Sequence, residues 1–229
     1  MKALILSGGL GKRLRPITDY LPKPLVPIDS IPIIEWQARY FKKFGIKEIV
    51  VCAGYRNEQI IDYLSKKNLG VRVSYSIEKT PLGTGGAIKN ARKYIADEES
   101  FFVINGDVIT DIDLNKLRAR KNSIAVIPLR SAFGLVHLTK DKVERFEEKP
   151  KALSYWMNAG VYHLNSEIIK SLPTCGNIEN TTFPKFASIG NLYAIKFNNV
   201  LWRSIDSHKD IEDCVMEMKS MRYERFLSK

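Results

Sequence analysis

Short apolar runs and amphipathic stretches alternate through the first half of the chain. Four runs read as buried strands, and apolar residues at helical spacing over residues 33–44, ended by Gly45, predict a helix between two of them. Such alternation is typical of a mostly parallel sheet covered by helices on both faces. We therefore expect a Rossmann-like α/β fold with a mixed, mostly parallel sheet, whose ligands lie beyond the carboxyl ends of its strands. The four runs cover residues 3–7, 48–53, 71–77 and 101–105.

Polar residues at the starts of the amphipathic stretches indicate where helices begin. Side-chain oxygens of Asn, Asp and Thr accept hydrogen bonds from the first free N–H groups of a helix. We expect Asn57 and Thr84 to cap helices that run to residues 64 and 94, and Asp111 and Asp113 to cap the next helix.

The pattern changes beyond Leu129. Residues 135–138 and 143–146 flank a polar turn, which predicts a hairpin and hence a small antiparallel extension of the fold. No linker, repeat or low-complexity tract interrupts the chain, so residues 1–229 are interpreted as a single domain. Further strands and a closing helix are expected at residues 159–164, 192–197 and 200–205 and after Ser207.

Composition excludes several classes of protein. With 229 residues, of which 45% are hydrophobic and 27% charged, the chain can bury a sizeable core. It has no apolar run of membrane-spanning length and no signal-peptide pattern, so we expect a cytoplasmic protein without a membrane partner. Three scattered cysteines and three scattered histidines match no disulfide framework and no zinc-binding spacing.

The net charge of +11 favours an anionic partner. Phosphorylated metabolites, nucleic acids and acidic membranes would all respond to such a charge. The basic residues are spread along the chain without a basic tail or the aromatic and basic interleaving of an RNA-binding sheet, so nucleic acid is the weaker alternative.

A glycine-rich turn follows the first apolar run. Gly8, Gly9 and Gly11 precede Lys12 and Arg13, a composition that lets backbone N–H groups approach a phosphate closely. A P-loop needs glycine where Leu6 stands and Ser or Thr where Arg13 stands, and a dinucleotide fingerprint needs glycine where Leu14 stands. Both familiar phosphate motifs therefore fail here.

A longer motif continues from this turn. Arg13, Leu14, Arg15, Pro16 and Thr18 are followed by PKPLVP at residues 22–27. The stretch resembles the signature of the nucleotide-sugar pyrophosphorylases, GGxGxRLxPxT with PKPLVP after it. Further matches come in the family's order: EKTPLGTGGA (78–87), NGDVITD (105–111), EKP (148–150), NAG (158–160) and the pair Phe183, Pro184.

The resemblance covers nearly the whole chain and implies both a fold and a reaction. It implies a nucleotide-binding α/β core, mainly residues 1–129, and a sugar-phosphate-binding part with the C-terminal helix, mainly residues 130–229. It also implies Mg²⁺-dependent transfer of NMP from an NTP to a sugar 1-phosphate, as in mannose-1-phosphate guanylyltransferases. Related enzymes commonly form homo-oligomers, and many add a C-terminal left-handed β-helix that we do not expect here.

Roles for individual residues follow from the matched positions. The implied catalytic residues are Arg13, Lys23, Asp107 and Lys149. The implied nucleotide-binding residues are Leu6, Ser7, Gly8, Gly9, Gly11, Lys12, Arg13, Glu78, Pro81, Gly83, Thr84, Asn105 and Gly106. The implied sugar-phosphate-binding residues are Gly134, Glu148, Lys149, Asn158 and Ala159, and the implied Mg²⁺ ligand is Asp107, with Asp206, outside the matched positions, as the candidate second ligand.

The expected reaction explains why these residue types are needed. A phosphate oxygen of the sugar 1-phosphate attacks the α-phosphorus in line, so the protein mainly positions and neutralises anions. Arg13 would stabilise the departing pyrophosphate, and Lys23 would reach the α-phosphate. Lys149 would bind the incoming phosphate, and Asp107, directly after a buried strand, would hold Mg²⁺.

Glu78 indicates the base. A carboxylate can accept from guanine N1–H and N2–H₂ together, whereas uracil and thymine offer one imide donor flanked by carbonyls. This favours GTP, with mannose 1-phosphate or a similar sugar 1-phosphate as acceptor. The alternatives are a UTP- or dTTP-using relative that acts on glucose 1-phosphate, and a CTP-using relative that acts on an alditol or inositol phosphate.

One position departs from the family pattern. The family usually carries WxDIGT near its C-terminus, and its aspartate is a second metal ligand, but here Ser204 stands in that place and Asp206 follows two residues later. In a strand this moves the carboxylate by about 6 to 7 Å along the same face. The departure motivates a second hypothesis: a catalytically weak regulatory homologue that binds a nucleotide sugar.

Overall fold

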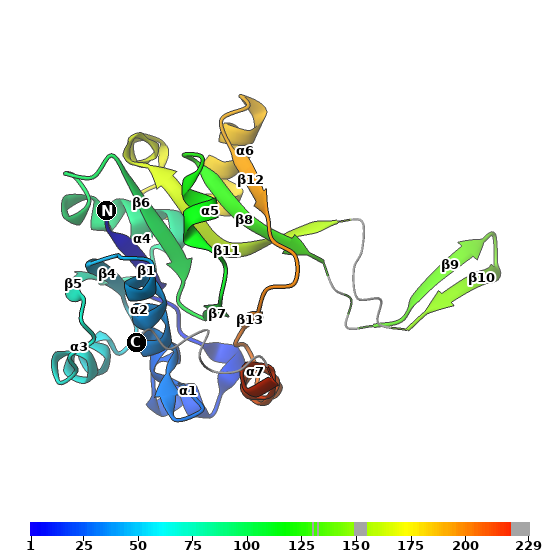
Figure 1. Ribbon diagram of the computed structural model, residues 1–229, viewed down its shortest axis with the longest axis horizontal. Helices are drawn as coiled ribbons and strands as arrows, with labels where there is room; N and C mark the ends of the chain where they lie inside the picture. The colour runs from blue at the N-terminus through cyan, green and yellow to red at the C-terminus, as the bar shows by residue number, and fades with distance from the viewer. Residues whose placement is uncertain (130, 132, 149–154, 221–229) are drawn as a thin grey trace.

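The structure is a computed structural model that describes residues 1–129, 131, 133–148 and 155–220. Its central sheet contains β1 (Ala3–Ser7), β4 (Glu48–Ala53), β5 (Arg72–Ile77), β6 (Ser100–Asn105), β8 (Ser123–Pro128), β11 (Trp156–Asn165) and β12 (Tyr193–Lys196). In the described residues the strand order is β12, β8, β11, β6, β1, β4, β5. Strand β11 is antiparallel to both of its neighbours, and the other neighbouring pairs are parallel. The predicted mixed, mostly parallel sheet is therefore confirmed (Figure 1).

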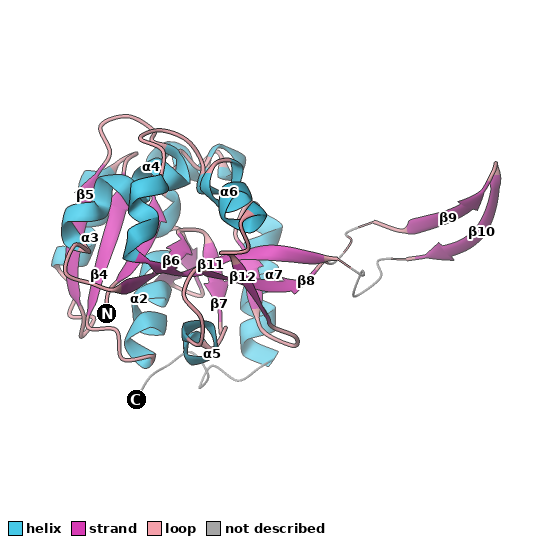
Figure 2. Ribbon diagram, turned by 90° about the horizontal axis from the view of Figure 1, so that it is seen from above, coloured by secondary structure: helices cyan, strands magenta, loops and turns pink. Residues whose placement is uncertain are grey.

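Helices cover both faces of this sheet, as predicted (Figure 2). The α-helices are α1 (Ile17–Tyr20), α2 (Ile33–Lys43), α3 (Asn57–Ser65), α4 (Gly83–Asn90), α5 (Leu114–Arg118), α6 (Thr182–Ser188) and α7 (His208–Ser220). Short 3₁₀ helices are η1 (Lys12–Leu14), η2 (Lys23–Leu25), η3 (Ala91–Tyr94), η4 (Ser166–Ser171) and η5 (Ile178–Asn180).

The apolar runs divide their side chains between two cores because successive strand residues point to opposite faces. In β1, Ala3 and Ile5 belong to the core under α2, α3 and α5, and Leu4 belongs to the core under α4 and α6. All three are fully buried. This double burial explains why the strands read as continuous apolar runs in the sequence.

Turns at one edge of the sheet define the functional region. Strands β1, β4, β5 and β6 are parallel, so their carboxyl ends lie along the same edge. The glycine turn follows β1, Glu78 follows β5, and the Asn105–Gly106–Asp107 turn follows β6. The Gly106 N–H donates to the Leu6 carbonyl over 2.9 Å, which ties the first and last of these turns together.

Two small sheets and a third core close this edge. Strands β7 (Val108–Thr110) and β13 (Trp202–Ser204) form an antiparallel pair, and β2 (Pro27–Ile28) pairs with β3 (Ile31–Pro32). Helix α7 buries Cys214 and Met218 against apolar residues of these segments. Since β13 pairs with the strand that follows Asp107, residues near the C-terminal end of the chain reach the edge of the sheet where the glycine turn lies.

The predicted antiparallel extension is a hairpin of β9 (Leu135–Thr139) and β10 (Lys142–Glu147). It projects away from the main body (Figures 1 and 2). Its cross-strand pairs place Val136 opposite Phe146 and Leu138 opposite Val143, and these four apolar side chains are 48 to 60% exposed.

Three of the predicted helix caps are wrong. Helix α3 begins at Asn57, whose side-chain amide donates to the Gly54 carbonyl. Thr84 lies inside α4, where its hydroxyl donates to Glu179. The Asp111 carboxylate accepts from the Leu201 N–H, whereas Asp113 caps α5 as predicted. Tertiary partners take the polar groups of Thr84 and Asp111, and the side chain of Asn57 instead bonds locally to the preceding turn.

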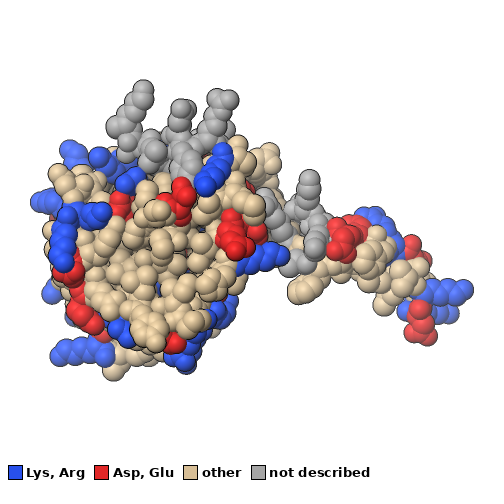
Figure 3. Space-filling view, turned by 90° about the horizontal axis from the view of Figure 1, so that it is seen from below, with Lys and Arg blue, Asp and Glu red and all other residues tan. Residues whose placement is uncertain are grey.

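Charged residues are spread over the surface. On the face shown in Figure 3, Lys and Arg lie mainly around the rim, with Asp and Glu between them. Among the described residues, no helix has both the length and the apolar character needed to span a bilayer.

Candidate active site

A cavity of about 420 Å³ lies at the carboxyl edge of the sheet. Every residue predicted to bind nucleotide lines it, together with Lys23, Asp107 and Asp206. Sequence reasoning missed four further lining residues: Leu14, Pro24, Leu82 and Asn177. The first three lie within matched motifs, which was the available signal, whereas Asn177 lies in none.

The glycine turn is shaped by close packing. Gly11 has φ of 62°, and a Cβ atom there would lie 2.9 Å from the Thr18 methyl carbon. The Thr18 hydroxyl donates to the Gly11 carbonyl over 2.8 Å and fixes the turn. After Gly11 the chain enters η1, which buries Leu14 and leaves Lys12 and Arg13 exposed at the cavity. The turn therefore holds two cationic side chains at the cavity on a backbone that is fixed by close packing and by the Thr18 hydrogen bond.

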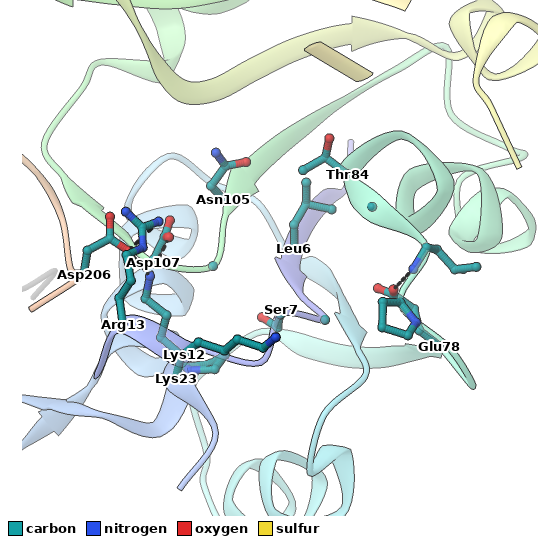
Figure 4. Close-up of a pocket in the computed structure, with 18 of the residues that line it drawn as sticks. Leu6, Ser7, Lys12, Arg13, Lys23, Glu78, Thr84, Asn105, Asp107 and Asp206 are labelled. Atoms are coloured by element: carbon teal, nitrogen blue, oxygen red, sulfur yellow. Dashed lines mark hydrogen bonds and ion pairs between the residues drawn. The ribbon is translucent and has the colours of Figure 1, made fainter. Parts of the chain in front are cut away.

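Lys23 lies between two carboxylates at one end of the cavity (Figure 4). Its Nζ is 2.7 Å from Asp107 Oδ2 and 2.7 Å from Asp206 Oδ1. The Arg13 guanidinium lies 3.1 Å from the same Asp206 oxygen. The four predicted residues Arg13, Lys23, Asp107 and Asp206 thus meet in one cluster, although the chain separates Lys23 and Asp206 by 183 positions.

Ser204 and Asp206 act together at this cluster. The Ser204 hydroxyl donates to Asp206 Oδ2 over 3.2 Å, and the Ile205 N–H donates to the Asp107 carbonyl over 2.9 Å. Ile205 continues the pairing of β13 with the segment before β7, and the Asp206 carboxylate, on the same side as Ser204, contacts Lys23 beside Asp107. The displacement of this carboxylate along the strand stays a prediction, and the shared contact with Lys23 brings Asp206 into the same cluster as Asp107.

The charges of the cluster favour an ionised Asp206. Burial by itself raises the pKa of this carboxyl group, but the hydrogen bond and charge of Lys23, the charge of Arg13 and the Ser204 hydroxyl outweigh burial and lower the pKa below its usual value. An ionised Asp206 beside Asp107 gives the cavity two hard oxygen ligands.

These two carboxylates suit a divalent cation. Both contact the same Lys23 nitrogen, so they are close enough for one ion to bind both in its place. Within the described part of the chain, no group of three or more His, Cys, Asp or Glu side chains could hold a metal ion. One or two carboxylates, completed by phosphate oxygens and water, is the usual coordination of Mg²⁺ at nucleotide sites.

Glu78 lies at the opposite end of the cavity (Figure 4). Its Oε2 accepts from the Leu82 N–H over 3.1 Å, and its Oε1 is buried without a hydrogen-bond partner in the described residues. Burial raises the pKa of Glu78, and the Leu82 hydrogen bond opposes that rise in part. A Cβ on Gly8 would lie 2.5 Å from Oε1, so the glycine turn must lack a side chain for this carboxylate to fit.

Four of the five residues predicted to bind the sugar phosphate are described, and none of these four lines the cavity. Gly134 and Glu148 lie at the base of the projecting hairpin, and Ala159 is buried beneath Trp202, whose indole N–H donates to its carbonyl. The Asn158 amide contacts the Tyr162 hydroxyl and the Gly160 N–H. Lys149 lies outside the described residues.

The chain is similar in sequence to known nucleotidyl transferases. A family model described as "Nucleotidyl transferase" matches residues 2–220. A D-glycero-alpha-D-manno-heptose 1-phosphate guanylyltransferase from Campylobacter jejuni is 41% identical over 173 residues, which cover 73% of this chain and 77% of that protein. A mannose-1-phosphate guanyltransferase from Yarrowia lipolytica is 37% identical over 227 residues, which cover 92% of this chain but 62% of the relative's length.

Solved structures show the same fold. The crystal structure of HddC from Yersinia pseudotuberculosis complexed with GMP-PN has a TM-score of 0.75 and 30% sequence identity. The superposition covers 95% of this chain and 99% of that chain.

Proposed function

The chain belongs to the nucleotidyl transferase family, and we propose on this premise that it transfers GMP from GTP to a sugar 1-phosphate, releasing pyrophosphate. Mannose 1-phosphate and a manno-heptose 1-phosphate are the acceptors named for two guanylyltransferases that are similar in sequence, and we propose them as acceptors here. One observation carries the proposal: a single cavity holds a cation and carboxylate cluster at one end and a buried carboxylate, suited to guanine, at the other.

The proposed mechanism uses the cluster to assemble anions. Lys23 would carry its charge to the α-phosphate, and Arg13 would bind the β and γ phosphates that leave as pyrophosphate. Neither residue has to become covalently attached to the nucleotide. The rate gain comes from holding two mutually repelling phosphates at attack distance and from stabilising the charge that develops on them.

Lys23 must change partners in this scheme. Its ammonium group now neutralises Asp107 and Asp206, each 2.7 Å away. We propose that these carboxylates bind Mg²⁺, which supplies charge neutralisation at the triphosphate when it is present. Lys23 would then be free to reach the α-phosphate, so the same lysine would balance the two carboxylates and serve the reaction.

Glu78 is the proposed determinant of base choice. Its unpartnered Oε1 and the adjacent Oε2 match the N1–H and N2–H₂ donors of guanine. The imide of uracil or thymine would leave one carboxylate oxygen unpaired and would bring a carbonyl close to it. Cytosine offers an exocyclic amine but no neighbouring ring N–H on that edge.

The sugar side of the site remains a prediction from the family resemblance. We propose that Glu148, Lys149 and Asn158, with the backbone at Gly134 and Ala159, bind the sugar 1-phosphate. This assigns residues 1–129 mainly to the nucleotide and residues 130–229 mainly to the sugar phosphate, although Asn177 and Asp206 also reach the nucleotide cavity. We also propose that the protein is cytoplasmic and forms a homo-oligomer. Light scattering that gives the mass of a single chain would refute the homo-oligomer.

A two-dimensional substrate screen tests the function. Pyrophosphate release is measured for GTP, ATP, UTP, dTTP and CTP with a set of sugar 1-phosphates in the presence of Mg²⁺, and the screen is repeated with Asp107→Ala. Release with GTP and a manno-configured acceptor, lost in the variant, is the expected result. Tight GTP binding without release for any pair would instead favour the regulatory homologue that Ser204 motivates, and salt-sensitive binding of an oligonucleotide that GTP fails to displace would favour a nucleic-acid-binding module.

A further inference from the structure

A chain of hydrogen bonds connects the nucleotide cavity to Asn158. The Thr84 hydroxyl donates to Glu179 Oε2 over 2.5 Å, and the Tyr162 hydroxyl donates to Glu179 Oε1 over 3.0 Å. The Asn158 side-chain amide in turn donates to the Tyr162 oxygen over 2.9 Å. Glu179 therefore lies at the centre of a relay with one end at the nucleotide cavity and the other at a predicted sugar contact.

The nucleotide end of the relay is held by the same segment. The Thr84 hydroxyl accepts from the Ile178 N–H over 3.0 Å, and the Thr84 N–H donates to Asn177 Oδ1 over 3.2 Å. Both Thr84 and Asn177 line the cavity. The position of η5 is thus coupled directly to the wall of the nucleotide cavity.

The sugar end of the relay is fixed by a buried phenol. Tyr162 is fully buried and packs edge-on against Phe183. Burial, and next the negative charge of Glu179, raise the pKa of Tyr162, so its hydroxyl stays protonated and remains a donor. Because the Tyr162 hydroxyl donates its proton to Glu179, its oxygen must be the acceptor in the hydrogen bond with Asn158.

The carboxylate sets the direction of every bond in the relay. An ionised carboxylate accepts hydrogen bonds and cannot donate them. Two accepting oxygens therefore force Thr84 and Tyr162 to donate, which turns the Asn158 Nδ2 toward Tyr162 and its Oδ1 toward the Gly160 N–H, 2.9 Å away. An amide at position 179 would donate at one end and would remove one of the two contacts that orient the Asn158 amide, leaving the Gly160 N–H as the other.

We propose that Glu179 is a positioning residue that fixes the orientation of the Asn158 amide for the sugar 1-phosphate and joins that subsite to the nucleotide cavity through Thr84. Within the described residues, no lysine or arginine forms an ion pair with Glu179. Partly burying a carboxylate without a cationic partner costs desolvation free energy that a neutral side chain would avoid. A carboxylate does, however, impose one direction on the hydrogen bonds that it accepts. The inference rests on the proposed function, in which Asn158 contacts the sugar.

Steady-state kinetics with Glu179→Gln test the inference. A hydrogen bond to the sugar contributes about 1 kcal/mol, so the KM for the sugar 1-phosphate should rise about fivefold to tenfold. The affinity for GTP, measured by calorimetry, should change by less than about twofold, because glutamine still offers Thr84 an acceptor. Exposed Glu167 provides the matched control: Glu167→Gln should leave both quantities unchanged.

A second variant separates direction from packing. Tyr162→Phe removes the hydroxyl and keeps the ring, so it should raise the same KM, and the double variant should show no further rise because both changes break one relay. Additive effects of the two changes, or equal losses of GTP affinity and sugar affinity with a lower melting temperature, would show that Glu179 only stabilises the fold.

The two proposals fail in different ways. An active wild-type enzyme whose KM for the sugar 1-phosphate is unaffected by Glu179→Gln would overturn the inference and leave the proposed function intact. A wild-type protein that binds GTP but transfers it to no sugar 1-phosphate would overturn both.

Discussion

Glu78→Gln should have opposite effects on stability and on the use of GTP. The carboxylate is buried, and one of its oxygens has no partner in the described residues, so its charge is unfavourable until a ligand supplies donors. Glutamine removes the charge at nearly constant volume and can still accept from the Leu82 N–H. We therefore expect a higher melting temperature for the ligand-free variant at pH 7.

The loss on the nucleotide side can be estimated from hydrogen bonds. A carboxylate that accepts from both guanine donors makes two charge-assisted bonds, and the glutamine amide would present a donor to one of them. Losing one such bond costs about 1.5 to 3 kcal/mol, or roughly a 10- to 150-fold fall in kcat/KM for GTP. Exposed Glu58 on α3 supplies the control, and Glu58→Gln should change neither quantity.

The pH dependence has a definite sign. Folding raises the pKa of Glu78 above its usual value of 4.5, so the folded state binds the proton more tightly than the unfolded chain. Stability from this group is therefore present below pH 4.5 and is lost as the pH rises through the higher pKa of the folded state. The advantage of Glu78→Gln should disappear in acid, and the affinity of wild-type protein for GTP should fall as the pH drops toward that raised pKa.

Two measurements check this reasoning. Thermal unfolding at pH 7 and below pH 4.5 follows stability, and pyrophosphate release with varied GTP follows base recognition. A less stable variant, or one that uses GTP as well as the wild type does, would refute the assignment of Glu78 to guanine.

Three further predictions concern the glycine turn and the charged cluster. Asp206→Asn should raise the Mg²⁺ concentration needed for half-maximal activity about tenfold or more. Ser204→Ala should raise it less, because Ser204 contacts Asp206 through one hydrogen bond from a neutral hydroxyl. Equal effects of the two variants in a metal titration would argue against Asp206 as a ligand. Lys23→Met should destabilise the protein without Mg²⁺ by about 1 to 3 kcal/mol, because Asp107 loses its cation and Asp206 keeps only Arg13. Mg²⁺ should raise the variant's melting temperature more than that of the wild type, and an equal Mg²⁺ response would contradict the exchange of partners. Gly11→Ala should cost about 1 to 3 kcal/mol in urea unfolding, because its φ is positive and its Cβ would strike Thr18, whereas Gly9→Ala, where a Cβ meets nothing within 4 Å, should cost little.

Much of the fold follows from local pattern. The predicted bounds of β1 and β4 match the structure because these strands are buried on both faces and are ended by glycine or polar residues. The carboxyl edge of the sheet was predictable for the same reason, since parallel strands bring their ends together. Strands of two residues and three residues such as β2 and β7 carry too little pattern to be recognised before their partners are known, whereas β13 lies within the strand predicted at residues 200–205.

Contacts between distant segments were beyond the sequence. Spacing along a strand put the Asp206 carboxylate about 6 to 7 Å from the expected ligand position, and only the structure shows that it contacts Lys23 and the Ser204 hydroxyl. The sequence predicted Thr84 as a helix cap, but in the structure its hydroxyl donates to Glu179 and its N–H donates to Asn177. Local propensity gives the polar residues that need partners, and only the tertiary structure decides which partners they find.

The most direct test of the account is a crystal structure of the protein with a non-hydrolysable GTP analogue and Mg²⁺. We predict guanine against the Glu78 carboxylate, the metal on Asp107 and Asp206, and the Lys23 ammonium group moved from those carboxylates to the α-phosphate. A nucleotide bound with its base away from Glu78, or with Lys23 still between the two aspartates and no metal there, would contradict it.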